Sequence, residues 1–300
     1  MGTPSILKAS QLAIGAAGTA IGSYTDRFEF NSITPGGGVG LIDTSEEATR
    51  GTRSRSKERV AQGLIETTLN IVLNPSPAEL DILLPMILGG AESVDSFPLA
   101  ETTAYKDILV DWSVHRQIYQ DCLVNRAEFS SSQGQPLRLS LEFWCRTQDT
   151  PVATAFPSIA VDTDNIYVHH QGVLTARSAA RDFSEASVVI DNNLERSYNN
   201  AQNPTFIFPT DRVIELTGNV PFTSDEDDLY TGPLASAAGA AGTLVYTNGG
   251  QSLTFTFGNL KEQDASPPAM TGGETRQSIT WRAYKSGSTA ELAVTHDSSA

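Results

Sequence analysis

Segments that alternate apolar and polar residues recur along the chain, and this pattern limits the possible folds most. The clearest is 137–147, LRLSLEFWCRT, in which leucines and Phe143 alternate with Arg138, Ser140 and Glu142. Successive side chains of a strand point to opposite faces, so the segment predicts a strand with one buried face. The other segments that favour strands are 22–32, 64–73, 108–114, 118–129, 186–191, 212–220, 253–260, 277–284 and 290–295. We therefore expect a mainly β protein.

One helix is well marked, at 76–89. Ser76, Pro77 and Glu79 predict a capping box with proline at the first helical position. Pro85 should kink or shorten this helix, and the glycines at 89 and 90 should end it. The apolar residues expected to share its buried face are Leu80, Leu83, Leu84 and Ile87.

The same order of elements occurs in both halves of the 300 residues: strand, polar excursion, strand, capped helix and further strands. This order favours a duplication with two tandem domains, 1–150 and 151–300. The first would contain a long loop at 34–62 and the helix at 76–89. The second would have a short helix opened by a capping box at 223–226, and a Gly/Ala-rich loop at 232–242.

The loop at 34–62 contains a basic run in an otherwise acidic chain. Formal net charge is −15, yet five cations stand close together in this loop: Arg50, Arg53, Arg55, Lys57 and Arg59. Two interpretations are open, a solvated loop and an arm that docks on an acidic surface of another copy. Nucleic-acid contact is a weaker third, because phosphate binding needs a basic surface and the chain as a whole is acidic.

Two cysteines, Cys122 and Cys145, are too few for a disulfide framework. They could face each other on neighbouring strands. We expect a buried reduced pair rather than a bridge, because free cysteine behaves as a small apolar residue.

Candidate chemistry is sparse. His169 and His170 follow a strand-like segment and are expected to be a surface pair, not metal ligands. The carboxylates at 225–228 fit a helix N-terminus better than a calcium loop. The glycine-rich segment at 36–40 lacks the ending of a phosphate loop, and no catalytic grouping was found. We expect no catalytic, cofactor-binding or metal residues, no cofactor and no enzyme activity. No apolar stretch is long enough to span a bilayer, so no membrane partner is expected.

The second half resembles phage tail tube proteins of the long, non-contractile type. The resemblance is carried by ASVVIDNNL at 186–194 and RVIELTGNVPFTSDEDDLY at 212–230, which are similar to that family's strand, turn and strand before a short helix. The helix segment PAELDILLPMILGG at 77–90 is similar in plan. The likeness extends over most of 20–295.

The resemblance implies β-sandwich or barrel-like domains, each flanked by a helix, whose sheets join edge to edge in rings. Rings would stack into a hollow tube, and DNA would pass through it without specific binding. Two tube domains per chain would give trimeric, pseudo-hexameric rings; one would give hexamers. The implied partners are further copies and the tail terminator, tape measure and tail-tip proteins. The implied location is the tail of the virion, assembled in host cytoplasm, and the 34–62 loop would reach adjacent subunits.

Alternative functions are a tail terminator, a baseplate part, a capsid decoration protein or a carbohydrate-binding sandwich. The last would favour exposed aromatic residues in a groove, whereas Trp112, Trp144 and Trp281 lie in strand patterns.

Overall fold

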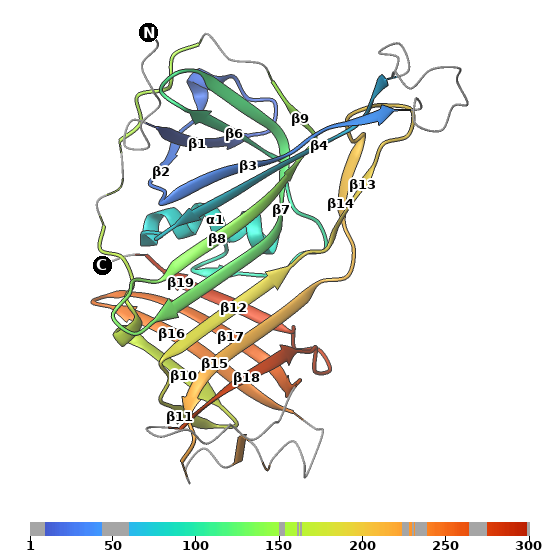
Figure 1. The fold of residues 1–300 in the computed structure, drawn as a ribbon. Coiled ribbons are helices and arrows are strands. Elements are labelled where there is room, and N and C mark those ends of the chain that lie inside the picture. The colour runs from blue at the N-terminus through green and yellow to red at the C-terminus, as the bar shows by residue number, and fades with distance from the viewer. Residues whose placement is uncertain are drawn as a thin grey trace.

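The computed structural model is mainly β, as the alternating segments predict. It describes residues 10–43, 60–149, 154–160, 162, 164–223, 228–229, 231, 239–263 and 275–298. A large antiparallel sheet, here called the central sheet, runs through the whole molecule (Figure 1). Its strands, in spatial order, are β3 (Ser32–Asp43), β4 (Val60–Leu73), β8 (Arg138–Cys145), β7 (Arg116–Ser132), β12 (Glu185–Asp191), β15 (Val213–Pro221) and β18 (Arg276–Ala283).

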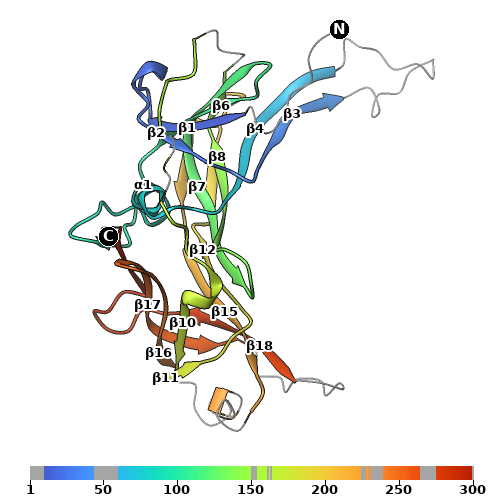
Figure 2. The same ribbon diagram turned by 90° about the vertical axis from the view of Figure 1, so that its left-hand side faces the viewer.

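One side of the central sheet is covered by two further groups of strands and by helix α1 (Pro77–Leu88). Figure 2 views the sheet nearly edge-on, with α1, β1, β2, β16 and β17 on the same side of it. The first group is β1 (Gln11–Ala16), β2 (Asp26–Phe28), β6 (Lys106–Asp111), the start of β7 and β9 (Thr147–Gln148). The second is β10 (Gly172–Ala176), β11 (Ala179–Arg181), β16 (Ala240–Asn248), β17 (Gln251–Glu262), β19 (Leu292–Asp297) and β5 (Ser96–Phe97). Two 3-10 turns (Ile21–Ser23 and His169–Gln171) and a separate hairpin, β13 (Leu194–Ser197) with β14 (Phe206–Pro209), complete the described elements.

Alternation decides which side of each strand is buried. In β8, Leu139, Leu141 and Phe143 are buried against the covering layer, and the residues between them are partly or fully exposed. Burying these side chains removes apolar area from water at about 25 cal/mol per Å², so the register of the strand is strongly specified.

Helix α1 forms as predicted. Ser76 accepts a hydrogen bond from the Glu79 amide, and the Glu79 carboxylate accepts one from the Ser76 amide. Gly89, with φ of 85°, ends the helix in the left-handed conformation that glycine adopts without strain. The helix continues through Pro85 to Leu88, so the proline does not end it. The predicted apolar face is buried.

The structure corrects the predicted loop at 34–62. Residues 34–43 and 60–62 belong to β3 and β4, which form a long hairpin that extends away from the body of the molecule (Figure 1). The glycines at 36–38 pair with β4, and Gly37 does so with a positive φ of 78°, a conformation that glycine adopts without strain. The basic run, Arg50, Arg53, Arg55, Lys57 and Arg59, lies outside the described residues. The loop predicted at 232–242 is also shorter, because β16 begins at Ala240.

The same set of strand pairings occurs twice. β1 pairs with β2 and β6, and β6 with β7, as β10 pairs with β11 and β16, and β16 with β17. The order β3–β4–β8–β7 in the central sheet is matched by β12–β15–β18–β17. Even the register shift at Lys106/Ile108 of β6 has its counterpart at Ala240/Gly242 of β16. Two tandem domains with a boundary near residue 150 stay a prediction that these pairings support.

Cys122 and Cys145 form a disulfide between β7 and β8, so the expectation of a reduced pair was wrong. Both are buried, and they continue the ladder beyond the Leu123–Trp144 pair. The corresponding pair in the second set of strands is Leu260 and Ala283. Opposed positions on adjacent strands bring two side chains close enough to bond, which the sequence spacing could not reveal.

We expect the disulfide to contribute stability but not to be required for the fold. Replacing Cys122→Leu with Cys145→Ala copies the apolar pair of β17 and β18. Denaturant unfolding should show a loss of about 2–4 kcal/mol or less. The matched control is Cys122→Ser with Cys145→Ser, which buries two hydroxyls and should lose more. Equal losses in both variants would contradict the apolar role of this position.

We also expect Glu79 to make the protein less stable as pH rises above the unfolded pKa of its carboxyl group. Burial raises the pKa of Glu79, although the amides of Ser76 and Glu29 act in the opposite direction. A raised folded pKa favours the protonated carboxyl in the folded state. The contribution of Glu79 is therefore greatest below its unfolded pKa of about 4.3 and declines through the interval up to its folded pKa. Thermal unfolding of Glu79→Gln should depend less on pH than that of the wild type. The exposed Glu92→Gln serves as control, and an unchanged pH dependence in Glu79→Gln would contradict the assignment.

Candidate functional site

The candidate site is the side of the central sheet that no covering strand or helix occupies, here called the polar face. Its members are the outward residues of β4, β8, β7, β12, β15 and β18, at alternate positions. They include Glu66, Thr68, Asn70, Val72, Arg126, Glu128, Ser130, Ser132, Arg138, Ser140, Glu142, Glu185, Ser187, Val189, Asp191, Val213, Glu215, Thr217, Asn219, Arg276, Ser278, Thr280 and Arg282. Only three of these residues are apolar, so this face is suited to contact with water or a polar partner.

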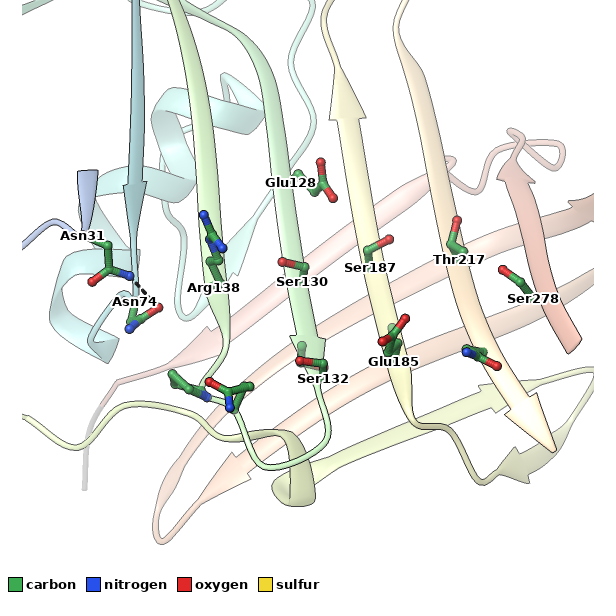
Figure 3. A pocket seen from close by; sticks show the side chains of 15 residues that line it. Asn31, Asn74, Glu128, Ser130, Ser132, Arg138, Glu185, Ser187, Thr217 and Ser278 are labelled. Carbon is green, nitrogen blue, oxygen red and sulfur yellow. Dashed lines mark hydrogen bonds between the residues drawn. The ribbon is translucent and has the colours of Figure 1, made fainter. Parts of the chain in front are cut away.

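Small hydroxyl side chains form a continuous row across the middle of this face. Ser130 stands opposite Ser187, Ser187 opposite Thr217, and Thr217 opposite Thr280. The Thr217 and Thr280 hydroxyls are 3.1 Å apart and hydrogen-bonded. Because these side chains are short, the face is hollowed here by about 430 Å³ (Figure 3).

Charged residues border the hydroxyl row. Glu128, Arg138 and Glu185 line the hollow (Figure 3). Arg282 donates to the Glu215 carboxylate from two nitrogens, at 2.7 and 3.2 Å, and this hydrogen bonding raises the pKa of Arg282. On the other side of the row, Arg126 stands opposite Glu142 and Asp191.

The polar face has an excess of negative charge. Its outward carboxylates are Glu66, Glu128, Glu142, Glu185, Asp191 and Glu215, and its outward guanidinium groups are Arg126, Arg138, Arg276 and Arg282, which leaves six negative charges against four positive ones. The whole chain, which includes these residues, has a formal net charge of −15. A polyanion that approaches this face meets hydroxyl groups and a negative field, which disfavours adhesion.

The geometry offers no catalytic arrangement on this face. His169 is buried, so the prediction that His169 and His170 form a surface pair is wrong. The ring nitrogens of His169 lie 3.3 Å from the Ser131 hydroxyl and 3.2 Å from the Phe183 carbonyl oxygen. His170 is exposed. Within the described residues, no group of three or more His, Cys, Asp or Glu could hold a metal ion. Of the carboxylates at 225–228, only Asp228 is described, and it forms an ion pair with Arg181 at 2.7 Å.

The β13–β14 hairpin covers one end of the polar face. Leu194 and Ile207 are buried in a small cluster with Leu123 of β7, and the half-buried Trp144 packs against that cluster. The Arg196 guanidinium lies 3.9 Å from the centre of the Trp144 ring, which is a favourable cation–π contact. The hairpin is therefore fixed to the strands of the first half.

Large apolar side chains are exposed on the outer part of the β3–β4 hairpin. They are Val39, Leu41, Ile42, Val60 and Leu64, with exposed fractions from 40% to 70%. A two-stranded ribbon is marginally stable by itself, and a cluster of exposed apolar residues indicates an interface. The sequence did not reveal this surface, because all of these residues except Leu64 fall in the segment predicted to be a loop.

A buried polar chain also escaped the sequence analysis. Nδ1 of His296 lies 2.6 Å from the Asp81 carboxylate, and its Nε2 lies 3.3 Å from the Tyr167 hydroxyl. Burial raises the pKa of Tyr167, with smaller contributions from Asp81 and Asp297. The three residues come from α1, β19 and the segment before β10, so only the tertiary structure brings them together. They tie α1 to the second group of covering strands.

Two edges of the central sheet remain open among the described strands. β3 pairs with β4 alone, and residues 276–279 of β18 pair with β15 alone. None of the helices in the described part of the chain is long and apolar enough to cross a membrane.

A comparison with protein families matches residues 8–283 to the family described as phage tail tube protein. The match includes the strands of the central sheet and α1. A search of curated proteins found none that matches the chain.

Proposed function

The chain belongs to the phage tail tube protein family, a family of structural and non-enzymatic tail proteins, and on that premise we propose that it builds the hollow tube of the tail. Copies form rings, the rings stack, and the polar face lines the channel through which DNA leaves the virion. The observation that carries this proposal is the central sheet: one side carries the covering strands and α1, the other is polar, and the edge at β3 and residues 276–279 of the edge at β18 are open.

The joint between β7 and β12 supports ring formation through sheet edges. Within the chain, the fourth strand of one set, β7, pairs with the first strand of the next set, β12. The open edge at β3 is the first strand of its own set. A second copy that supplied its last strands to this edge would continue the same sheet, and an open edge is normally a liability unless a partner pairs with it.

The repeated pairings favour three chains per ring over six. Each chain contributes two sets of strands, so three chains supply six similar sets around the ring. A six-chain ring would leave one set of each chain outside the channel wall. Because the two sets share one sheet, both belong to the same wall.

The polar face suits a channel for DNA. Its excess of carboxylates repels phosphates at short range, and the hydroxyl row allows water to separate protein from DNA. Specific binding would require clustered cations, and the cations Arg126 and Arg282 already face carboxylates. The tail terminator, tape measure and tail-tip proteins are the proposed partners at the ends and inside of the tube.

We expect the purified protein to form hollow, striated tubes when concentrated, visible by negative-stain electron microscopy. Deleting 44–59, which removes Arg50, Arg53, Arg55, Lys57 and Arg59, should leave a folded protein that forms no long tubes, because the arm can no longer dock on adjacent copies. Circular dichroism checks the fold. Tubes of normal length from the deletion would disprove the docking arm. Closed rings that never stack in the wild type would favour a terminator or decoration protein.

Charge reversal on the polar face should slow DNA passage without preventing assembly. Glu128→Lys with Glu185→Lys adds two cations beside the hollow, which attract phosphates. Phage assembled with this variant should release DNA more slowly, measured with a dye that detects ejected DNA, and the delay should shrink at high salt. Glu92→Lys with Glu101→Lys, both exposed in the segment after α1, makes the same charge change elsewhere. An equal delay in both variants would contradict the channel assignment.

A further inference from the structure

The outer part of the β3–β4 hairpin and the β13–β14 hairpin occupy corresponding positions in the two sets of strands. Residues 32–38 of β3 pair with β4 in the same pattern as β12 pairs with β15. Beyond this point the register of β3 and β4 shifts by one residue, between Val39 and Leu41. The pairing of β13 with β14 continues the pairing of β12 with β15, and its register is shifted by one residue in the same direction. Leu41 therefore corresponds to Leu194, and Val60 corresponds to Ile207.

The two corresponding hairpins differ sharply in burial. Leu194 and Ile207 are 4% and 2% exposed, because they pack on Leu123. Leu41 and Val60 are 70% and 40% exposed. The same apolar positions are thus covered in one hairpin and uncovered in the other, and what covers the first is the preceding set of strands.

The surface that covers β13–β14 also has a counterpart in the second set. Trp144 of β8 stands opposite Thr68 of β4, as Arg282 of β18 stands opposite Glu215 of β15. Leu123 pairs with Trp144, as Lys261 pairs with Arg282. Lys261 and Arg282 therefore stand at the positions in the second set of strands that correspond to Leu123 and Trp144 in the first.

We propose that Leu41 and Val60 of one copy dock on the Lys261–Arg282 surface of a second copy of this chain. The contact repeats between copies what β13–β14 does within one. This inference rests on the proposed ring, and it names the residues that would join one copy to the next.

The chemistry of the receiving surface fits an apolar hairpin end with a polar border. Lys261 lies over the Tyr284 ring with its ammonium 5.4 Å from the ring centre, and Tyr284 is 39% exposed. The Arg282 guanidinium is held by Glu215 at 2.7 Å. Fixed in this way, the aliphatic stems of the two cations and the tyrosine ring offer apolar area to leucine and valine.

Matched substitutions at the corresponding leucines test the inference. Leu194→Ser should lower the unfolding midpoint of the unassembled protein, because this side chain is buried within the chain. Leu41→Ser should leave that midpoint unchanged and reduce rings and tubes at least tenfold by sedimentation and electron microscopy. Wild-type assembly by Leu41→Ser would overturn the proposal, as would an equal loss of midpoint in both variants.

Cross-linking tests the receiving surface. Val60→Cys with Lys261→Cys keeps Leu41 and should give, under mild oxidation of the assembled protein, covalent dimers and trimers that reductant removes. The single variants control for exchange with the Cys122–Cys145 disulfide, and Val60→Cys with Val173→Cys places the second thiol on the exposed β10 instead. Tubes without cross-links in the matched pair would overturn the docking site and leave the tube proposal standing. Absence of rings and tubes in the wild type would overturn both.

Discussion

Seven consecutive residue pairs between β7 and β12 hold the two halves of the molecule in one antiparallel sheet, and the rest of the structure depends on this joint. Without it, each half would present an open edge and a half-covered sheet. With it, the covering strands and α1 all lie on one side, and the other side becomes one extended polar face. A sheet buried on one face and solvated on the other needs alternating residues, and β8, β12, β15 and β18 have them along their whole length.

The joint between β7 and β12 also explains why two corresponding hairpins differ in burial. The β13–β14 hairpin is covered because strands of the first set lie against it, and among the described residues no set of strands lies against the outer part of the β3–β4 hairpin. The first contact is made inside the chain, and the docking proposed above would supply the second. An exposed apolar hairpin beside an open strand edge is unfavourable in a monomer, which gives association its driving force.

Much of the local structure could be predicted from sequence. β8 follows its alternation, and α1 begins at the capping box of Ser76 and ends at Gly89. Membership of the tail tube family also followed from the residues at 186–194 and 212–230. The loop predicted around the glycines at 36–38 was wrong. Glycine-rich segments are typical of loops, but here β4 supplies a pairing partner for each of these glycines.

The sequence by itself determined the elements whose cause is local: alternation, caps and turn residues act over a few positions. Only the tertiary structure decided the Cys122–Cys145 bond, the chain of Asp81, His296 and Tyr167, and the hydroxyl row of the polar face. Each of these joins strands or helices that are distant in sequence. Their proximity depends on strand order and register, which arise from the packing of the whole sheet and not from any short segment.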